Sequence, residues 1–223
     1  MSDAAPGSSY LSKHRVEALT DGIFAVAMTL LVIELKIPEA AQIKTQEQLI
    51  VALWHLFPKL IAWVISFFVL AIFWVSHHRL FHFVRVVDGK LTWMTIGYLA
   101  CVSLIPFSSM LAGEYSGALV SQIFYSINMA LLGIMALLKS RYVHLHPELC
   151  GTPMPVGLFK GARLRTAGLI VIAIVAILIT WALPGKGAIG NSAFMLMIVF
   201  SKISRRIEAR HAAELTESKF LGI

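Results

Sequence analysis

The chain has 223 residues, of which 58% are hydrophobic and 14% are charged, and its mean hydropathy is +0.78. Soluble domains are about 45–50% apolar and about 25% charged, so this composition excludes an ordinary soluble enzyme domain and a disordered or fibrous chain. Six membrane-spanning helices of about 20 residues would use about 120 residues. The chain is therefore expected to be an all-α integral membrane protein with little room for a domain outside the membrane.

Apolar runs predict six spans in chain order, over about residues 16–36, 49–77, 91–112, 117–138, 166–184 and 188–203. Pro58 and Lys59 divide the second run, so we expect an interfacial turn of helix over 46–57 and the span itself over 60–77. Three prolines indicate that residues 139–165 form a loop. The expected organisation is a cytoplasmic tail over 1–14, a transmembrane domain over 15–204 and a second cytoplasmic tail over 205–223.

The positive charges are distributed very unevenly over these segments. If the N-terminus is cytoplasmic, 15 of the 19 Lys and Arg residues lie in cytoplasmic segments, and the external ones are Lys36, Lys44, Lys59 and Lys186. The positive-inside rule then predicts that both termini are cytoplasmic, in a multi-pass protein of the cell (plasma) membrane. Because these residues are dispersed over separate segments, the net charge of +7 does not indicate a nucleic-acid groove.

Asp21 lies about one turn inside the first apolar run. A carboxylate in lipid is costly, so Asp21 should face protein or water and should have a partner. Arg15 is six residues away and does not share a helix face with Asp21, which makes a partner on another span more favourable. The alternative is that Thr20 or Asp21 only caps the start of a helix at the membrane surface.

Val26, Leu30 and Ile33 are spaced by four and three residues, so they fall on one face of the first helix, and Thr29 adjoins them. Such a stripe is common in ordinary packing between membrane helices, and spacing alone does not separate that reading from a pore lining.

The segment Arg15-x-x-x-Leu19-Thr20-Asp21-Gly22 resembles the Arg-x-x-x-Phe-Ser-Asp-Gly motif that opens the first helix of one channel family. The departures are Leu19 in place of Phe and Thr20 in place of Ser. Both replacements keep the character of the side chain, the first apolar and the second a hydroxyl.

A second segment, Trp74-x-x-His77-His78-x-x-Phe81, resembles the Trp-x-x-His-His-x-x-Phe pattern of the same family at the end of its second span. On these two motifs the chain is similar to bacterial single-repeat members of the lysosomal/endosomal potassium channel family. In the later spans the resemblance is one of pattern only.

The resemblance implies a homotetramer around a central pore that the first helix of each subunit lines. The family lacks a carbonyl filter, and the sequence contains no Thr-Val-Gly-Tyr-Gly loop. Carried over by position, Val26, Leu30 and Ile33 would form apolar constrictions that act as a hydrophobic gate, and Thr29 would favour potassium. Val26 is smaller than the usual residue, so we expect Leu30 or Ile33 to set the narrowest point.

The resemblance also implies a structural polar network of Arg15, Asp21, Trp74 and His77 that holds the first helix at its pore-lining angle. The expected function is a leak-like potassium-selective channel, not an enzyme. Its expected partners are monovalent cations, membrane lipid and further copies of itself, with no nucleic acid. No cofactor or metal is expected, and K⁺ is the permeant ion.

Two other classes remain to be weighed against a channel. A secondary cation or proton-coupled transporter could use Asp21 and His77 as a proton relay, but the sequence shows no convincing inverted repeat. A membrane enzyme could bind a metal through His78 and His82, which have the i, i+4 spacing of helix-borne ligands. The shortage of further converging ligands argues against this enzyme.

Overall fold

The computed structural model describes residues 12–36, 43–183, 187–197 and 199–206. Its elements are α1 (Lys13–Ile33), α2 (Gln46–His55), α3 (Phe57–Phe83), α4 (Gly89–Glu114), α5 (Leu119–Leu145), η2 (Pro147–Leu149), α6 (Val156–Ala182), α7 (Gly187–Ser192) and η3 (Ala193–Met195). Helix is also present over 196–197 and 199–206, and these residues together are called the helix over 196–206 below. The described residues contain one isolated β-bridge but no strand, which confirms the all-α prediction.

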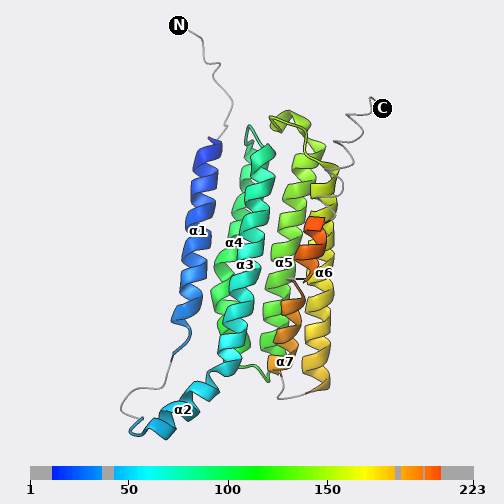
Figure 1. Ribbon diagram of the computed structural model, residues 1–223. Coiled ribbons are helices and arrows are strands. Elements are labelled where there is room, and N and C mark those ends of the chain that lie inside the picture. The colour runs from blue at the N-terminus through cyan, green and yellow to red at the C-terminus, as the bar shows by residue number, and fades with distance from the viewer. Residues whose placement is uncertain (1–11, 37–42, 184–186, 198, 207–223) are drawn as a thin grey trace.

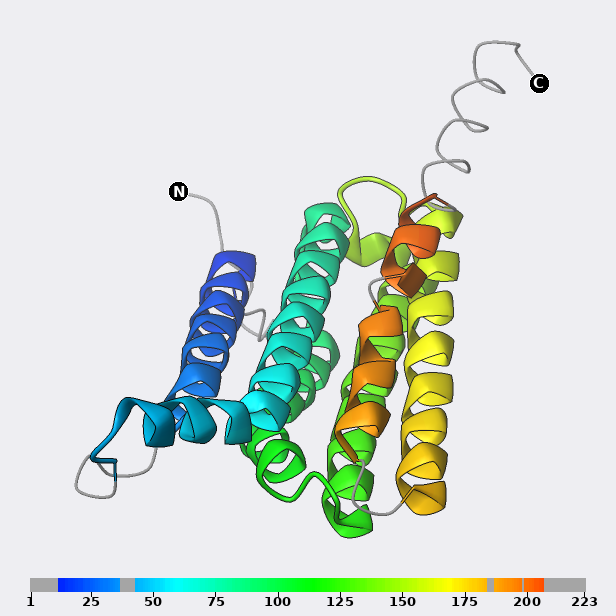
Figure 2. The same ribbon diagram turned by 60° about the horizontal axis from the view of Figure 1, so that its bottom comes forward.

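The long helices form an up-and-down bundle with α1 at one edge (Figure 1). Helix α1 packs on α3 and α4, α4 on α5, and α5 on α6, while α7 lies against α6 and α3. Figure 2 shows α2 at the far end, directed away from the bundle axis. The start of α1 and the helix that ends at residue 206 lie at the same end, which we call the basic end because Lys and Arg of the α1 start, the α3–α4 connection and the α6 start gather there.

Among the residues that the structure describes, five helices, α1, α3, α4, α5 and α6, are long and apolar enough to cross a membrane, one fewer than the six spans predicted. The expected sixth segment is helical but broken into α7, the 3₁₀ turn η3 and residues 196–206. The 3₁₀ turn at Ala193–Met195 directly follows α7, which contains the weak helix formers Gly187, Gly190 and Ser192.

The loop predicted over 139–165 is wrong for most of its length. Helix α5 continues to Leu145, and α6 begins at Val156, ten residues before the predicted span. No proline interrupts the chain between the apolar run and Pro147, so the helix continues through polar residues. Hydropathy marks the lipid-contacting part of a helix and does not mark where the helix ends.

The separate helix expected over 46–57 is present as α2. The Thr45 hydroxyl accepts a hydrogen bond from the Gln48 amide, and the Gln48 side chain accepts one from the Thr45 amide, which forms a capping box. Just beyond α2, Lys59 of α3 forms an ion pair with Glu114 of α4. These contacts anchor the end of the bundle opposite the basic end.

The α3–α4 and α5–α6 connections pair with each other at the basic end. The Arg85 amide donates to the Leu149 carbonyl at 2.8 Å, and the Gly151 amide donates to the Phe83 carbonyl at 3.0 Å. Asp88 caps α4 through the Leu91 amide and accepts a hydrogen bond from the Tyr142 hydroxyl. The four central helices are thus tied together at this end, whereas α1 is attached to the bundle by one side only.

Candidate functional site

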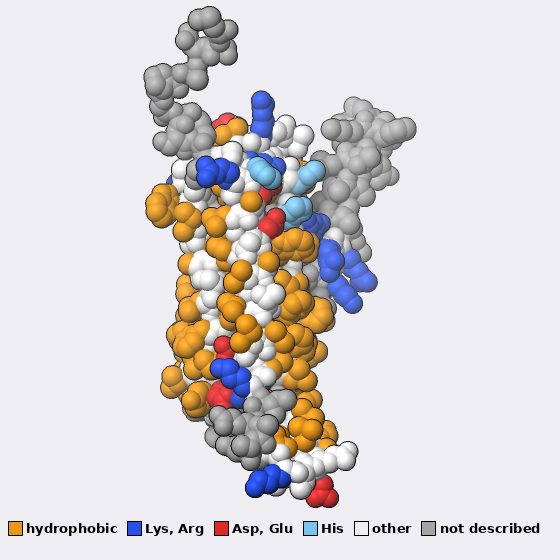
Figure 3. Space-filling model, turned by 90° about the vertical axis from the view of Figure 1, so that its left-hand side faces the viewer, with side chains coloured by type: hydrophobic (Ala, Val, Ile, Leu, Met, Phe, Trp, Pro, Cys, Tyr) orange, Lys and Arg blue, Asp and Glu red, His pale blue; other side chains and the backbone are white. Residues whose placement is uncertain are grey.

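Helix α1 buries one face and leaves the other uncovered by the described residues. Its buried residues, which recur every three or four positions, are Val16, Thr20, Phe24, Ala27 and Leu31. The opposite side carries polar and apolar residues together. Figure 3 looks at this edge of the bundle, where hydrophobic side chains cover the length between charged groups near the two ends.

The predicted constriction residues lie on this outward side. The exposed fractions are 56% for Val26, 41% for Leu30 and 58% for Ile33. With 3.6 residues per turn the three side chains form one stripe along α1, so copies of the chain arranged around an axis would present them as successive apolar rings. A single subunit encloses no pore, and the stripe by itself does not establish one.

Thr29 is also exposed and adjoins this stripe. Its hydroxyl donates to carbonyl oxygens of its own helix. Thr29 Oγ1 lies 3.0 Å from the Ala25 carbonyl oxygen and 2.9 Å from the Val26 carbonyl oxygen. A hydroxyl that donates in this way still has oxygen lone pairs to offer. Thr29 therefore presents an acceptor on the outward side, which is the polarity that a cation requires.

Asp21 and Trp74 come together as the motifs predict. The Trp74 indole Nε1 donates a hydrogen bond of 2.8 Å to Asp21 Oδ1, and the indole stacks on His78 of its own helix. This bond joins α1 to α3 across 53 positions of sequence. The carboxylate therefore has the partner on another span that its position in the first helix requires.

The other two members of the predicted network are placed elsewhere. Arg15 is exposed, and its side chain makes no ion pair or side-chain hydrogen bond with the described residues. His77 is buried and turns into the bundle, where its Nδ1 lies 2.9 Å from the Lys139 ammonium. Trp74 and His77 are three residues apart on α3, and the structure directs one ring toward α1 and the other toward α4 and α5.

Lys139 is a functional candidate that sequence reasoning missed. Its side chain is 1% exposed, and the ammonium lies 3.5 Å from the centre of the Tyr98 ring as well as against His77. Lys139 is one of the 15 charges expected in cytoplasmic segments, because the apolar run ends at residue 138. The available signal was the absence of a helix breaker before Pro147, which keeps Lys139 on the helix.

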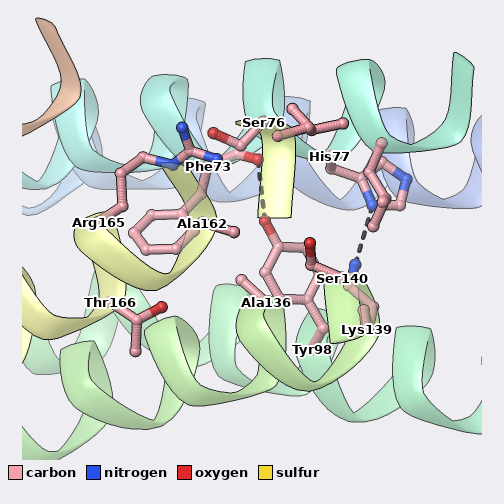
Figure 4. Close-up of a pocket in the computed structure, with 12 residues that line it drawn as sticks. Phe73, Ser76, His77, Tyr98, Ala136, Lys139, Ser140, Ala162, Arg165 and Thr166 are labelled. Carbon is pink, nitrogen blue, oxygen red and sulfur yellow. Dashed lines mark hydrogen bonds between the residues drawn. The ribbon is translucent and has the colours of Figure 1, made fainter. Parts of the chain in front are cut away.

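A cavity of about 30 Å³ lies beside this cluster (Figure 4). Helices α3, α4, α5 and α6 all contribute to it, and its charged and polar lining includes His77, Tyr98, Lys139, Arg165 and Thr166. A site of this size holds one or two waters, and its polar walls make water the natural occupant. The cavity is too small and too enclosed to be the ion path of the subunit.

Metal binding finds no support among the residues that the structure covers, where no group of three His, Cys, Asp or Glu side chains could hold an ion. His82 lies edge-on against Phe83, and His78 stacks on Trp74. The i, i+4 spacing of the two histidines therefore has a packing role in this part of the chain.

A helical, multi-pass bundle whose first helix leaves a face with apolar and hydroxyl groups unpartnered defines a membrane protein of the channel and transporter class. The chain is similar to the family described as endosomal/lysosomal potassium channel TMEM175, whose match covers residues 15–106, that is most of α1, all of α2 and α3, and most of α4. Lys139 and Arg165 lie outside the matched segment.

The relatives are named as ion channels and not as enzymes. A Streptomyces collinus protein named as a potassium channel is 37% identical over 105 residues, which are 45% of this chain and 48% of the relative. A Chamaesiphon minutus protein with the same kind of name is 38% identical over 101 residues, 45% of this chain and 49% of the relative. The match therefore spans about half the length of these bacterial relatives. A chicken relative, 31% identical over 49% of this chain and 23% of its own length, is named as the endosomal/lysosomal proton channel TMEM175.

The similarity in three dimensions extends over most of the chain. A crystal structure of a lysosomal potassium-selective channel TMEM175 homolog from Chamaesiphon minutus matches with a TM-score of 0.70 and 26% identity, over 86% of this chain and 97% of the other. A second structure, of a variant of the potassium channel MtTMEM175, matches with a TM-score of 0.54 and 17% identity over 94% of this chain and all of the other, and supports the fold alone.

Proposed function

We propose that the chain forms a leak-like, potassium-preferring cation channel in the cell membrane, as a homotetramer with α1 of each subunit around the pore. The observation that carries the proposal is the unpartnered face of α1, which presents Val26, Leu30 and Ile33 beside the outward Thr29 within the segment that matches the family. Relatives named as potassium channels support the choice of ion.

Conduction through such a pore depends on water as much as on the ion. A narrow ring of apolar side chains disfavours water and blocks ions by dewetting, and a slight widening would admit a partly hydrated cation. Potassium holds its water less tightly than sodium and so loses less on entering. Thr29 hydroxyl oxygens would replace part of the lost hydration. Because Val26 is the smallest of the three constriction residues, Leu30 or Ile33 would set the narrowest point.

The Asp21–Trp74 bond would hold α1 at its pore-lining angle through α3. His77 would act one layer further in, by fixing α3 against α5 through Lys139. Arg15 is exposed at the start of α1, where another subunit or a lipid headgroup could supply a partner for it. None of these residues needs to touch the ion.

The proposed topology has six crossings with both termini in the cytoplasm, the last crossing being the broken segment 187–206. About 20 residues of helix rise about 30 Å, enough to cross the hydrocarbon core. Exposed Trp54 and Trp181 lie near one end of the bundle and exposed Trp93 near the other, as expected for aromatic side chains at two membrane surfaces.

The experiment is potassium flux from liposomes reconstituted with the whole chain. Leu30→Asn should raise the flux several-fold because a polar side chain wets the constriction. Val32→Asn is the matched control, since Val32 is 51% exposed on the same helix but lies off the stripe. Equal effects of the two substitutions would contradict a constriction at Leu30, and flux that required a co-ion would favour a carrier.

A proton-conducting channel is the second candidate, because the animal relatives are named as proton channels. A proton relay from Asp21 to His77 would need contact between the two side chains. In the described structure Asp21 accepts a hydrogen bond from Trp74, whereas His77 contacts Lys139. A pH-sensitive dye inside the same liposomes separates the two functions. Proton entry without potassium movement would favour the second candidate.

A further inference from the structure

Three arginines from three segments line one pocket between α3, α6 and the helix over 196–206. They are Arg79, Arg165 and Arg205, and the pocket has a volume of about 140 Å³. No acidic side chain is among the described residues that line it. The rest of the lining is apolar or carries a hydroxyl: Phe68, Ala71, Ile72, Val75, Ser76 and Ser201.

The lining changes character along α3. Phe68, Ile72, Val75 and Arg79 follow one another at intervals of four, three and four residues, so they form a single stripe on that helix. Phe68 and Val75 are exposed, whereas Arg79 lies near the end of α3 at the basic end of the bundle. The groove is therefore apolar toward the middle of the protein and cationic where α3 ends.

The cationic end is held in place by packing. Arg165 is buried, and its Nη1 donates a 2.6 Å hydrogen bond to Ser204 Oγ. This bond fixes the helix over 196–206 against α6 and brings Arg205, one residue further on, to the same pocket. Guanidinium groups bind phosphate oxygens through paired hydrogen bonds, and a fixed guanidinium loses little entropy in doing so.

We propose that this pocket binds an anionic phospholipid of the leaflet at the basic end. Its phosphate would lie among the three arginines, and one acyl chain would run along Phe68, Ile72 and Val75. Basic pockets between membrane helices on the cytoplasmic side are typical sites for anionic headgroups. A free phosphate would contact the arginines but would leave the apolar half of the groove empty.

The bound lipid would bridge α3, α6 and the last helical segment. That segment is the broken one, and the Arg165–Ser204 hydrogen bond is one of the contacts that hold it to the bundle. Lipid binding should therefore raise the thermal unfolding midpoint of the protein, since any ligand that binds only the native state stabilises it. This site does not depend on which ion the protein conducts.

The test is the unfolding midpoint of the purified full-length chain in detergent, titrated with phosphatidylglycerol, phosphatidylcholine or inorganic phosphate. Phosphatidylglycerol should raise the midpoint, and the other two should not. Arg205→Gln and Arg79→Gln should each weaken the apparent affinity for phosphatidylglycerol roughly fivefold. Ala71→Phe fills the apolar part of the groove without changing charge and should also weaken it.

Arg206→Gln is the matched control, because Arg206 is exposed on the same helix but does not line the pocket. It should keep the wild-type response. An equal rise with phosphatidylcholine, an equal loss in Arg206→Gln and Arg205→Gln, or no rise with any lipid would each overturn the proposal. A rise in the midpoint with inorganic phosphate as large as with phosphatidylglycerol would overturn the proposal of a lipid site and would show a simple anion site.

Discussion

Lys139 is a fully buried lysine whose described contacts are the His77 imidazole and the face of the Tyr98 ring. A lysine in a membrane bundle is costly unless it has partners, and the imidazole of His77 together with the ring of Tyr98 supplies them. The sequence contains all three residues, but Lys139 and His77 are 62 positions apart, and no helical periodicity predicts their contact. The Asp21–Trp74 pair could be predicted because both residues stand in motifs of one family.

Lys139→Met should leave the thermal unfolding midpoint unchanged or raise it. Methionine keeps most of the side-chain volume and removes a charge without a carboxylate partner, and such replacements are often neutral or stabilising. Lys139→Ala should lower the midpoint, because it leaves a cavity worth about 2–5 kcal/mol. Arg141→Met, on the exposed side of the same helix, controls for the loss of a positive charge. A Met variant as unstable as the Ala variant would show that the ammonium itself is required.

Trp74→Phe should reduce potassium flux without changing the preference of potassium over sodium. Phenylalanine keeps the ring but cannot donate to Asp21, so α1 loses a hydrogen bond worth about 1 kcal/mol and its angle becomes less defined. Reversal potentials in a planar bilayer measure the selectivity. Trp181→Phe is the matched control, because Trp181 is exposed at the other end of the bundle. A changed selectivity with normal expression would place Trp74 at the ion path.

At the scale of the element, composition predicts where helices cross lipid better than where they begin and end. Helices α1, α3 and α4 agree with the predicted spans within several residues, whereas α5 and α6 extend well into the expected loop. A helix can continue through polar residues once it leaves the hydrocarbon layer, so an apolar run marks only the part of the helix that lipid surrounds. The break in the last segment comes after Ser192, next to the weak helix formers of α7, whereas the close packing of α7 on α6 depends on residues distant in sequence.

Gly190→Ala should destabilise the protein, although this change normally stabilises a helix by about 1 kcal/mol. A Cβ at residue 190 would lie 2.5 Å from Thr180 Oγ1 and 2.9 Å from the Ala176 carbonyl oxygen, so α7 would have to move away from α6. Overpacking of this kind costs about 1–3 kcal/mol, which lowers the unfolding midpoint by several degrees. Gly89→Ala is the control, since nothing lies within 4 Å of its added Cβ. A more stable Gly190→Ala variant would rule out the close α6–α7 contact.

At the scale of the whole molecule, the up-and-down bundle converts the charge asymmetry of the sequence into a spatial one. The chain runs from the basic end along α1 and returns to it at the end of α3, of α5 and of the segment 196–206. The helix ends at that end, together with Arg85 of the α3–α4 connection, carry most of the Lys and Arg residues outside the tails, and the positive-inside rule predicts that this end is cytoplasmic. The bundle also leaves α1 attached by one face, and a pore requires further copies to cover the other.

The proposed orientation predicts which positions a membrane-impermeant maleimide reaches in intact cells. In a background where Cys101 and Cys150 are replaced by Ala, Gly117→Cys in the α4–α5 turn should be labelled from outside. Glu148→Cys in the α5–α6 connection should be labelled only after lysis. Both positions are exposed in the subunit, so access of the reagent depends on the side of the membrane and not on burial.

Lys202→Cys tests whether the last segment crosses the membrane, because Lys202 is exposed on the helix over 196–206. If the broken segment crosses the membrane, this cysteine should behave like Glu148→Cys and react only after lysis. Labelling together with Gly117→Cys in intact cells would mean that the segment does not return to the basic side. The subunit would then have five crossings, with termini on opposite sides of the membrane.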